Sequence, residues 1–299
     1  MGGATGREVA DALGRVGVWL FGRAMGEEAP AFARRIEGLG YGALWVGGGN
    51  TNDGAFERLG GLLGGTDRLV VATGITSIWA WQPAALATRS AELAAAGGDR
   101  FVLGLGVSHA PLVEHLGRRY ERPFQTMVDF LDALVPALSG PGAPPVVLAA
   151  LGDRMLALSA ERAAGAHPYF TPVSHTAHAR ALLGAEPLLA PELAVVLDED
   201  PVTARATARA YMARYLGHPN YARNLARLGF RDADLASGGS DRLVDDIVAW
   251  GAPERIAARV REHLDAGADH VCIQPLAASG DTDEEALATL APLLVGDRR

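Results

Sequence analysis

Short, continuous apolar runs recur along the chain, and each has the length of a β-strand. They lack the alternation of polar and apolar residues that marks a sheet with one face in water. Continuous runs are typical of parallel sheets that are buried on both faces. We therefore predict eight buried strands, which span residues 15–21, 43–47, 68–75, 101–107, 145–150, 165–170, 192–197 and 270–274.

Between these runs, apolar residues repeat every three or four positions, which predicts amphipathic helices. Pro83 is placed to begin one helix and Gly97 to end it, and Asp200 is a suitable N-cap before Pro201. The predicted helices span residues 30–39, 83–96, 120–138, 201–216 and 253–266.

Alternation of strands and helices is the pattern of an α/β fold in which helices cover a parallel sheet. Eight repeats favour a closed (β/α)8 TIM barrel over an open doubly wound sheet. Because no low-complexity linker divides the chain, residues 1–299 are predicted to form a single domain.

The interval between the seventh and eighth predicted strands is much longer than the others. Its excess, residues 218–251, is predicted to be an insertion with short helices. Segments that follow barrel strands lie over the active-site mouth, so this insertion is a candidate lid or substrate-pocket wall. The alternative is a dimer contact or a packing element.

Charge and cysteine content narrow the class of protein. The formal net charge of −8 argues against a nucleic-acid-binding surface and against binding to an anionic membrane. The most apolar segment, residues 82–98, carries Arg89 and Glu92, and is therefore not predicted to span a membrane. Cys272 is the only cysteine, which excludes an intrachain disulfide. With no signal-peptide pattern at the N-terminus, we expect a cytoplasmic protein.

In a barrel, functional residues gather at the carboxyl ends of the strands. After the second predicted strand, residues 47–54 combine three glycines, which let a ligand approach the backbone, with Asn50. The alternative is a flexible loop with Asp53 as a helix N-cap. After the third, Ser77 is followed by Trp79 and Trp81, which suit a flat heterocyclic ligand unless they only pack the rim.

The loop after the fourth predicted strand begins with Gly104 and Gly106. A dinucleotide-binding fingerprint requires a third glycine at the position that His109 occupies, and Pro111 interrupts the following segment. We therefore interpret this stretch as a strand end that exposes backbone N–H groups and directs Ser108 and His109 toward the barrel mouth.

Two further strand ends carry polar groups. Gly152 lies where a helix is expected to begin, and free N–H groups there, with Arg154, could bind an anion. Residues 167–180 follow the sixth predicted strand, and contain His175 and His178 on one helix face. A zinc site needs further ligands that the sequence does not supply, so no metal site is predicted. The chain lacks a nucleophile motif or P-loop, which indicates that a cofactor supplies the chemistry.

The chain also carries a set of longer motifs, namely LGYGALWVGGG (39–49), LVVATGI (69–75), DRFVLGLGVSHAP (99–111), VVLAALGDRML (146–156), GAHPYFTPVSHTAHAR (165–180), NYARNLARLGF (220–230), DRLVDDIVAWG (241–251) and GADHVCIQPL (267–276). This set resembles the bacterial luciferase-like superfamily, and within it the actinobacterial branch of coenzyme F420-dependent oxidoreductases. The resemblance covers nearly the whole chain.

The resemblance implies a (β/α)8 barrel, usually a homodimer, that binds a flavin or deazaflavin at its mouth. It also implies a cis peptide bond at Gly74–Ile75 against the tricyclic ring. By the same resemblance, residues 106–109 contact the ring and ribityl chain, residues 149–152 the ribityl and phosphate region, and residues 169–176 the phosphate.

In two respects the sequence departs from its relatives. His109 and Leu112 stand where some relatives have acidic or amide residues, and Arg154 and His175 are the substitutes for basic phosphate ligands. The candidate cofactor-binding residues are Gly48, Gly74, Ile75, Ser77, Gly106, Val107, Ser108, His109, Ala149, Ala150, Gly152, Arg154, Tyr169, Thr171, His175 and Thr176.

The function implied by the resemblance is hydride transfer between reduced coenzyme F420 and a small-molecule organic substrate. His109 is the candidate general acid, because a histidine titrates near neutral pH, or else a hydrogen-bond partner of the cofactor. The alternatives are a monooxygenase that uses FMN in place of F420 and a flavin-binding barrel without catalytic activity.

Overall fold

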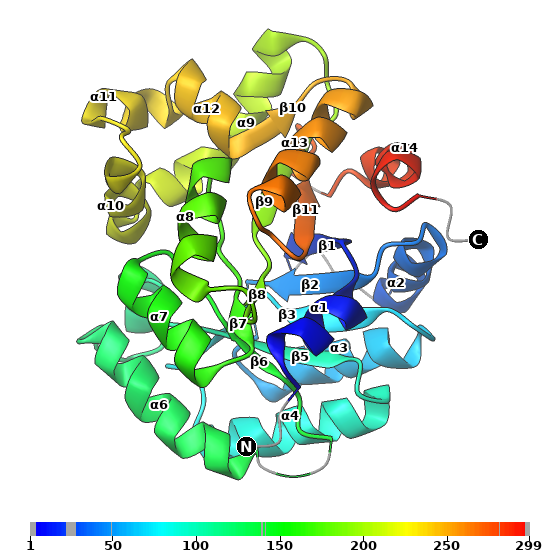
Figure 1. Cartoon of the computed structure of the whole chain (residues 1–299), viewed down its shortest axis with the longest axis vertical. Coiled ribbons are helices and arrows are strands. Elements are labelled where there is room, and N and C mark those ends of the chain that lie inside the picture. The colour runs from blue at the N-terminus through cyan, green and yellow to red at the C-terminus, as the bar shows by residue number, and fades with distance from the viewer. Residues whose placement is uncertain are drawn as a thin grey trace.

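A mostly parallel sheet curls into a barrel that helices surround (Figure 1). The structure is a computed structural model and describes residues 4–21, 28–48, 50–138, 140, 142–280 and 282–296. The predicted α/β class and TIM-barrel architecture are confirmed. The strands are β1 (Val16–Phe21), β2 (Ala43–Gly47), β3 (Val70–Thr73), β4 (Thr76–Ser77), β5 (Phe101–Gly106), β6 (Val146–Leu148), β7 (Gly165–Ala166), β8 (Leu188–Leu189), β9 (Glu192–Val196), β10 (Val248–Trp250) and β11 (Val271–Pro275).

The strand order explains how the barrel closes. The hydrogen-bonded order is β10-β9-β11-β1-β2-β3-β5-β6-β7-β8, and only Ala190 and Pro191 separate β8 from β9 in one continuous segment. Leu189 at the end of β8 pairs with Ala166 of β7, and its carbonyl accepts a hydrogen bond from Asp269 N at 2.9 Å. This segment therefore joins the two sides of the sheet.

Three strand predictions differ from the structure. The predicted strand 68–75 is divided into β3 and β4, because a cis peptide bond at Gly74–Ile75 interrupts it. The predicted strand 165–170 is limited to the two residues of β7. Pro168 has no backbone N–H to continue the ladder, and Phe170 has a positive φ of 59°. β10 lies inside residues 218–251, where only short helices were predicted, and adds to β9 outside the barrel.

Helices follow most strands and cover the outer face of the barrel (Figure 1). The predicted helix at 120–138 begins later, at Pro123, and a separate short helix precedes it. The helices are α1 (Gly6–Leu13), α2 (Ala29–Gly38), α3 (Asp53–Gly64), α4 (Pro83–Gly97), α5 (Ala110–His115), α6 (Pro123–Ala137), α7 (Asp153–Arg162), α8 (Val173–Leu183), α9 (Pro201–Leu216), α10 (Pro219–Arg227), α11 (Asp232–Leu235), α12 (Asp241–Ile247), α13 (Pro253–Asp265) and α14 (Glu284–Leu294).

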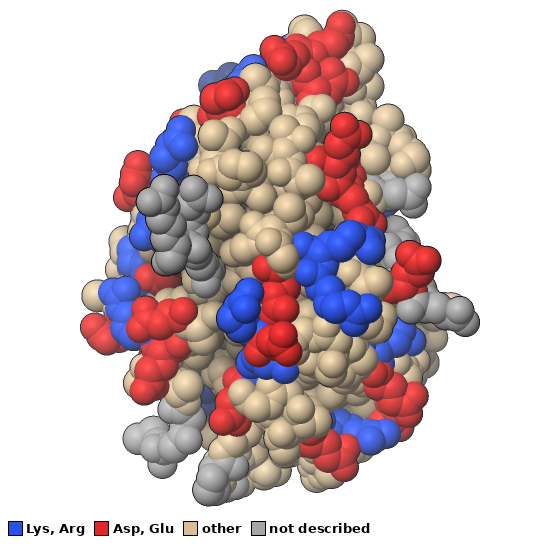
Figure 2. All heavy atoms as spheres, turned by 90° about the vertical axis from the view of Figure 1, so that its right-hand side faces the viewer, with Lys and Arg blue, Asp and Glu red and all other residues tan. Residues whose placement is uncertain are grey.

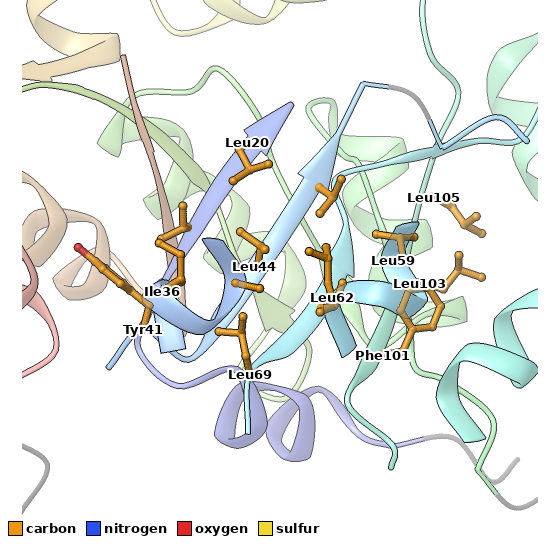
Figure 3. Packing of buried hydrophobic residues seen from close by; sticks show 14 of the residues in the cluster. Leu20, Ile36, Tyr41, Leu44, Leu59, Leu62, Leu69, Phe101, Leu103 and Leu105 are labelled. Carbon is orange, nitrogen blue, oxygen red and sulfur yellow. The ribbon is translucent and has the colours of Figure 1, made fainter. Parts of the chain in front are cut away.

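Successive side chains along each strand point alternately out of the barrel and into it, so they belong to two separate hydrophobic cores. Outward residues such as Leu44 and Leu103 pack against Leu59 and Leu62 of α3 (Figure 3). The residues between them point into the barrel, where Trp45 forms a stacked pair with His167 at 4.2 Å. Both faces are therefore apolar, which explains the continuous apolar runs in the sequence.

The surface is charged but mixed. Acidic and basic side chains are interspersed on the face drawn in Figure 2. Among the described residues, no helix combines the length and apolar character that a membrane span needs.

Candidate active site

A cavity of about 980 Å³ opens where the carboxyl ends of the barrel strands meet, and we call it the mouth cavity. Its volume lies at the upper end of the range for small-molecule and cofactor sites. Loops after β2, β4, β5, β6 and β7 form its floor, and α9 and α10 form one wall. Twelve of the predicted site residues line it: Gly48, Gly74, Ile75, Ser77, Gly106, Val107, Ser108, His109, Ala149, Gly152, Arg154 and Tyr169.

The floor of the mouth cavity is built from backbone and small residues. The peptide bond Gly74–Ile75 is cis, as the resemblance implied. The Asn50 amide donates to the carbonyl oxygens of Val46 (2.7 Å) and Ile75 (3.3 Å), and so ties this bulge to β2. Asn50 is 3% exposed, which contradicts the flexible-loop alternative, and the N-cap of α3 is Asn52 rather than Asp53. Gly49 lies outside the described residues.

Gly106 keeps the floor flat. A Cβ at this position would lie 2.6 Å from Ile75 Cδ1 and 3.3 Å from Ala149 Cβ. We expect Gly106→Ala to push Ile75 into the cavity, to lower the free energy of unfolding by about 1–3 kcal/mol, and to weaken cofactor binding. Denaturant unfolding and ligand titration would measure both effects.

Gly61→Ala is the matched control for Gly106→Ala. It lies within α3, and a Cβ there would meet nothing within 4 Å. Since alanine favours helix by about 1 kcal/mol over glycine, this variant should be slightly stabilised and should bind normally. Equal losses in both variants would contradict the role given to Gly106.

Trp79 and Trp81 hold the loops around the cavity but do not line it. The indole N–H of Trp79 donates to Val107 O at 2.8 Å, and that of Trp81 donates to Asn50 O at 3.0 Å. The rim-packing alternative therefore describes them better than stacking on a ligand.

His109 lies at the N-cap of α5 and faces the insertion. Its ring stacks on His218 with centroids 4.2 Å apart and planes 8° apart. Burial, and then the neighbouring His218, lower the pKa of His109 to about 4, against a hydrogen bond with Asn220. His109 is therefore neutral at pH 7, and the expectation that it titrates near neutral pH is wrong. A neutral imidazole remains able to hydrogen-bond a ligand.

Four predicted residues lie behind the cavity wall. Ala150 packs with Leu156 and Ala179 in a small core. His175 hydrogen-bonds Leu151 O at 2.9 Å through Nε2, so it supports the loop after β6 from below. Thr176 Oγ1 bonds His263 Nδ1 at 2.8 Å, and Thr171 is buried. The structure does not bring these side chains to the cavity surface. His175 and Thr176 lie on α8, which directs them toward the loop after β6 and toward α13.

Sequence reasoning selected no individual residue of the wall opposite the floor. The first part of residues 218–251 contributes to this wall, together with α9. Arg223 and Arg227 lie four residues apart on α10, a spacing that signals one helix face. The additional lining residues include Phe21, Tyr120, Phe124, Met155, His167, Arg214, Tyr215, His218, Asn220, Tyr221, Arg223 and Arg227.

Four arginines surround the opening of the mouth cavity: Arg154, Arg214, Arg223 and Arg227. Within the described chain, none of them lies at ion-pair distance from a carboxylate. Asp153, the acidic residue that lines the cavity, pairs instead with His178 at 2.9 Å. Arg227 donates to Leu151 O at 3.3 Å and lies over Gly152 at the start of α7. Helix N–H groups and guanidinium groups without a carboxylate partner are together suited to an anionic ligand.

A barrel of parallel strands with a cavity at their carboxyl ends defines the fold class. Comparison with known families is more specific. A model of the luciferase-like monooxygenase family matches residues 12–270, so the chain belongs to this family of oxidoreductases.

Individual relatives are distant. The 5,10-methylenetetrahydromethanopterin reductase of Methanolobus tindarius is 23% identical over 313 aligned positions, which cover 89% of this chain and 94% of the relative. The coenzyme F420-dependent tetrahydromethanopterin reductase of Methanopyrus kandleri superposes with a TM-score of 0.77 at 16% identity, over 95% of this chain and 99% of that one. The oxygenating constituent of 3,6-diketocamphane monooxygenase from Pseudomonas putida, in complex with FMN, superposes with a TM-score of 0.69 at 15% identity. This superposition covers 95% of this chain and 100% of that one. These similarities establish the fold. One of these structures is of a coenzyme F420-dependent enzyme and another contains FMN.

Proposed function

We propose that the protein is an oxidoreductase that transfers a hydride between reduced coenzyme F420 and an organic small molecule. The observation that carries the proposal is the group of four arginines at the mouth cavity, none of which has a carboxylate partner among the described residues. Coenzyme F420 ends in a phosphate followed by several carboxylates, whereas FMN ends in a single phosphate. The excess of fixed positive charge therefore matches the deazaflavin tail better.

The residues at the cavity fit the ring system as well. The cis bulge at Gly74–Ile75 and Gly106 leave a flat floor that a side chain would fill. The backbone of residues 149–152 lies between this floor and the arginines, where a polyol chain would run. When bound, the reduced deazaflavin supplies a hydride. The protein holds the ring against the floor, keeps His109 as a neutral hydrogen-bond partner, and anchors the tail through Arg223 and Arg227.

Reduced coenzyme F420 with menadione, a quinone that accepts a hydride, tests the reaction type. Under anaerobic conditions, we expect the protein to accelerate recovery of the absorbance of oxidised F420. Reduced FMN with oxygen is the parallel assay for the monooxygenase alternative. Turnover with FMN alone would overturn the proposal, and no turnover with either cofactor would favour a binding protein without catalytic activity.

A further inference from the structure

Glu192, the first residue of β9, is a buried acid without a cationic partner. It is 1% exposed, and no other acidic side chain in the described part of the chain is buried. Its oxygens accept hydrogen bonds from Phe170 N at 3.1 Å and from the Tyr211 hydroxyl at 3.3 Å. Burial raises the pKa of Glu192 to about 8, against these two hydrogen bonds. Glu192 therefore carries a proton at neutral pH.

A chain of hydroxyl groups connects Glu192 to the mouth cavity. The Tyr211 hydroxyl also interacts with the Tyr169 hydroxyl, and it donates to Tyr169 when protonated Glu192 donates to Tyr211 in turn. The Tyr169 hydroxyl donates to Gln274 Oε1 at 2.8 Å and lies 2.7 Å from the Tyr215 hydroxyl, which therefore donates to it. Tyr169 and Tyr215 both line the mouth cavity. We call Tyr169, Tyr211 and Tyr215 the tyrosine chain.

The far end of the tyrosine chain meets a second, smaller cavity of about 300 Å³. Tyr211 and Gln274 line this cavity, and Phe21 and Arg214 separate it from the mouth cavity, since they line both. The buried hydroxyls thus reach a second cavity from which water can exchange protons with them.

Two other titratable groups that line the mouth cavity, Asp153 and His109, are poor proton donors at neutral pH. Asp153 is exposed, and its hydrogen bond with His178 lowers its pKa. His109 is neutral at pH 7, as described above. Glu192, in contrast, holds an acidic proton at neutral pH.

We propose that Glu192 is the proton store of the reaction and that the tyrosine chain delivers its proton to the substrate. This rests on the proposed hydride transfer, and it assigns the substrate to compounds with a polarised double bond such as a carbonyl. The hydride adds to the carbon, and the oxygen takes the proton of a cavity-facing tyrosine. That tyrosine regains a proton from Tyr211, and Tyr211 from Glu192, whose carboxylate is then reprotonated by solvent.

Glu192 also stabilises the backbone at Phe170, and a test must separate this structural role from proton storage. Its bond to Phe170 N holds a residue with a positive φ of 59°. Glu192→Gln keeps this bond, because the amide oxygen still accepts it and the amide nitrogen still meets Tyr211. The variant loses only the exchangeable acidic proton. Glu192 does not touch the substrate in this proposal, and it acts only through Tyr211.

Infrared titration of the protein without cofactor tests whether Glu192 holds a proton. The groups that face Glu192 are Tyr211 on α9, Tyr169, Tyr221 on α10 and Cys272 on β11, and burial raises the pKa of each above its usual range. We expect a carboxylic-acid band that disappears as the pH rises through about 8. Glu192→Gln should lack it, and Tyr211→Phe should shift it. Absence of the band in the unmodified protein would overturn the proposal.

Kinetics with reduced coenzyme F420 and menadione test the relay itself. General acid catalysis contributes typically 10²–10⁴-fold, so Glu192→Gln and Tyr211→Phe should each slow turnover by about 10²-fold, with cofactor binding unchanged. The unmodified protein should lose rate as the pH rises above 8, and Glu192→Gln should lack this pH dependence. Tyr41→Phe, which removes a buried hydroxyl bonded to Leu287 O at 2.9 Å, is the matched control and should retain full rate.

Failure of the proposed function and failure of the proton relay give different results. If the unmodified protein does not oxidise reduced F420, the proposed function fails, and the relay fails with it as a catalytic device. If the unmodified protein turns over and Glu192→Gln keeps its rate and pH profile, only the relay is wrong, and Glu192 is a structural clamp for Phe170.

Discussion

Below pH 6.5 the protein is expected to lose stability steeply and to unfold between about pH 5 and pH 4. Four histidines, His167, His175, His263 and His270, are at most 1% exposed. Burial lowers the pKa of His263 to about 3 and of the other three to about 4, from 6.5. The unfolded chain therefore binds more protons than the folded one in this window, and stability falls as the pH falls.

The expected size of this acid effect is large. One pKa unit corresponds to about 1.4 kcal/mol, so each histidine destabilises the fold by about 2 kcal/mol at pH 5. Four such contributions approach the whole stability of a typical domain, about 5–15 kcal/mol. Glu192 has the opposite sign: because its folded pKa is raised, its contribution to stability falls as the pH rises from 4.5 to about 8. Because the four histidines together outweigh Glu192 below pH 6.5, stability should be greatest near pH 7, where the opposing slopes cancel.

Urea unfolding at a series of pH values measures the acid effect. His263→Gln should reduce the dependence on pH between 6.5 and 4, whatever its stability at neutral pH. His178→Gln is the control, because His178 is exposed and bonds only Asp153 in the described contacts. A stability that is flat from pH 7 to pH 4 would contradict the buried, neutral state of these histidines.

Replacement of Arg223 and Arg227 by glutamine should weaken coenzyme F420 binding about 10-fold for each change and about 100-fold together. Hydrogen bonds to charged groups contribute about 1.5–3 kcal/mol, and both side chains line the cavity without a carboxylate partner among the described residues. Because the interaction is ionic, binding to the unmodified protein should weaken with added salt, and the double variant should respond less.

The matched control is Arg58→Gln, which changes net charge equally. Arg58 is exposed on α3 and does not line either cavity. Fluorescence titration would give the dissociation constants. If the double variant bound F420 as tightly as Arg58→Gln, the anionic tail would not contact α10.

The floor of the site could be predicted from the sequence better than its wall. Local pattern places Gly74 and Gly106 at the ends of apolar runs and Gly152 at the start of a helix, and the structure has them at the ends of β3 and β5 and at the N-cap of α7. The arginines of α10 depend on how residues 218–251 fold back over the barrel. That arrangement is set by tertiary contacts, such as the packing of Tyr221 and Leu225 with Tyr211 of α9, and no local pattern encodes it.

Protonation was harder still to predict. His109 has an ordinary sequence environment, and its lowered pKa arises from burial beside His218, more than a hundred positions away in the chain. Glu192 follows a proline within an apolar run, and only the closed barrel reveals that it is enclosed without a cation. Both outcomes depend on desolvation, which is a property of the packed structure.

The central claim is that the mouth cavity is built for a deazaflavin with a polyanionic tail. Titration of the purified protein with coenzyme F420 and, separately, with FMN tests it most directly. We predict that F420 binds at least 10-fold more tightly than FMN at low salt, and that the difference shrinks as salt is added. Tighter binding of FMN, or equal binding of the two at every salt concentration, would contradict the account.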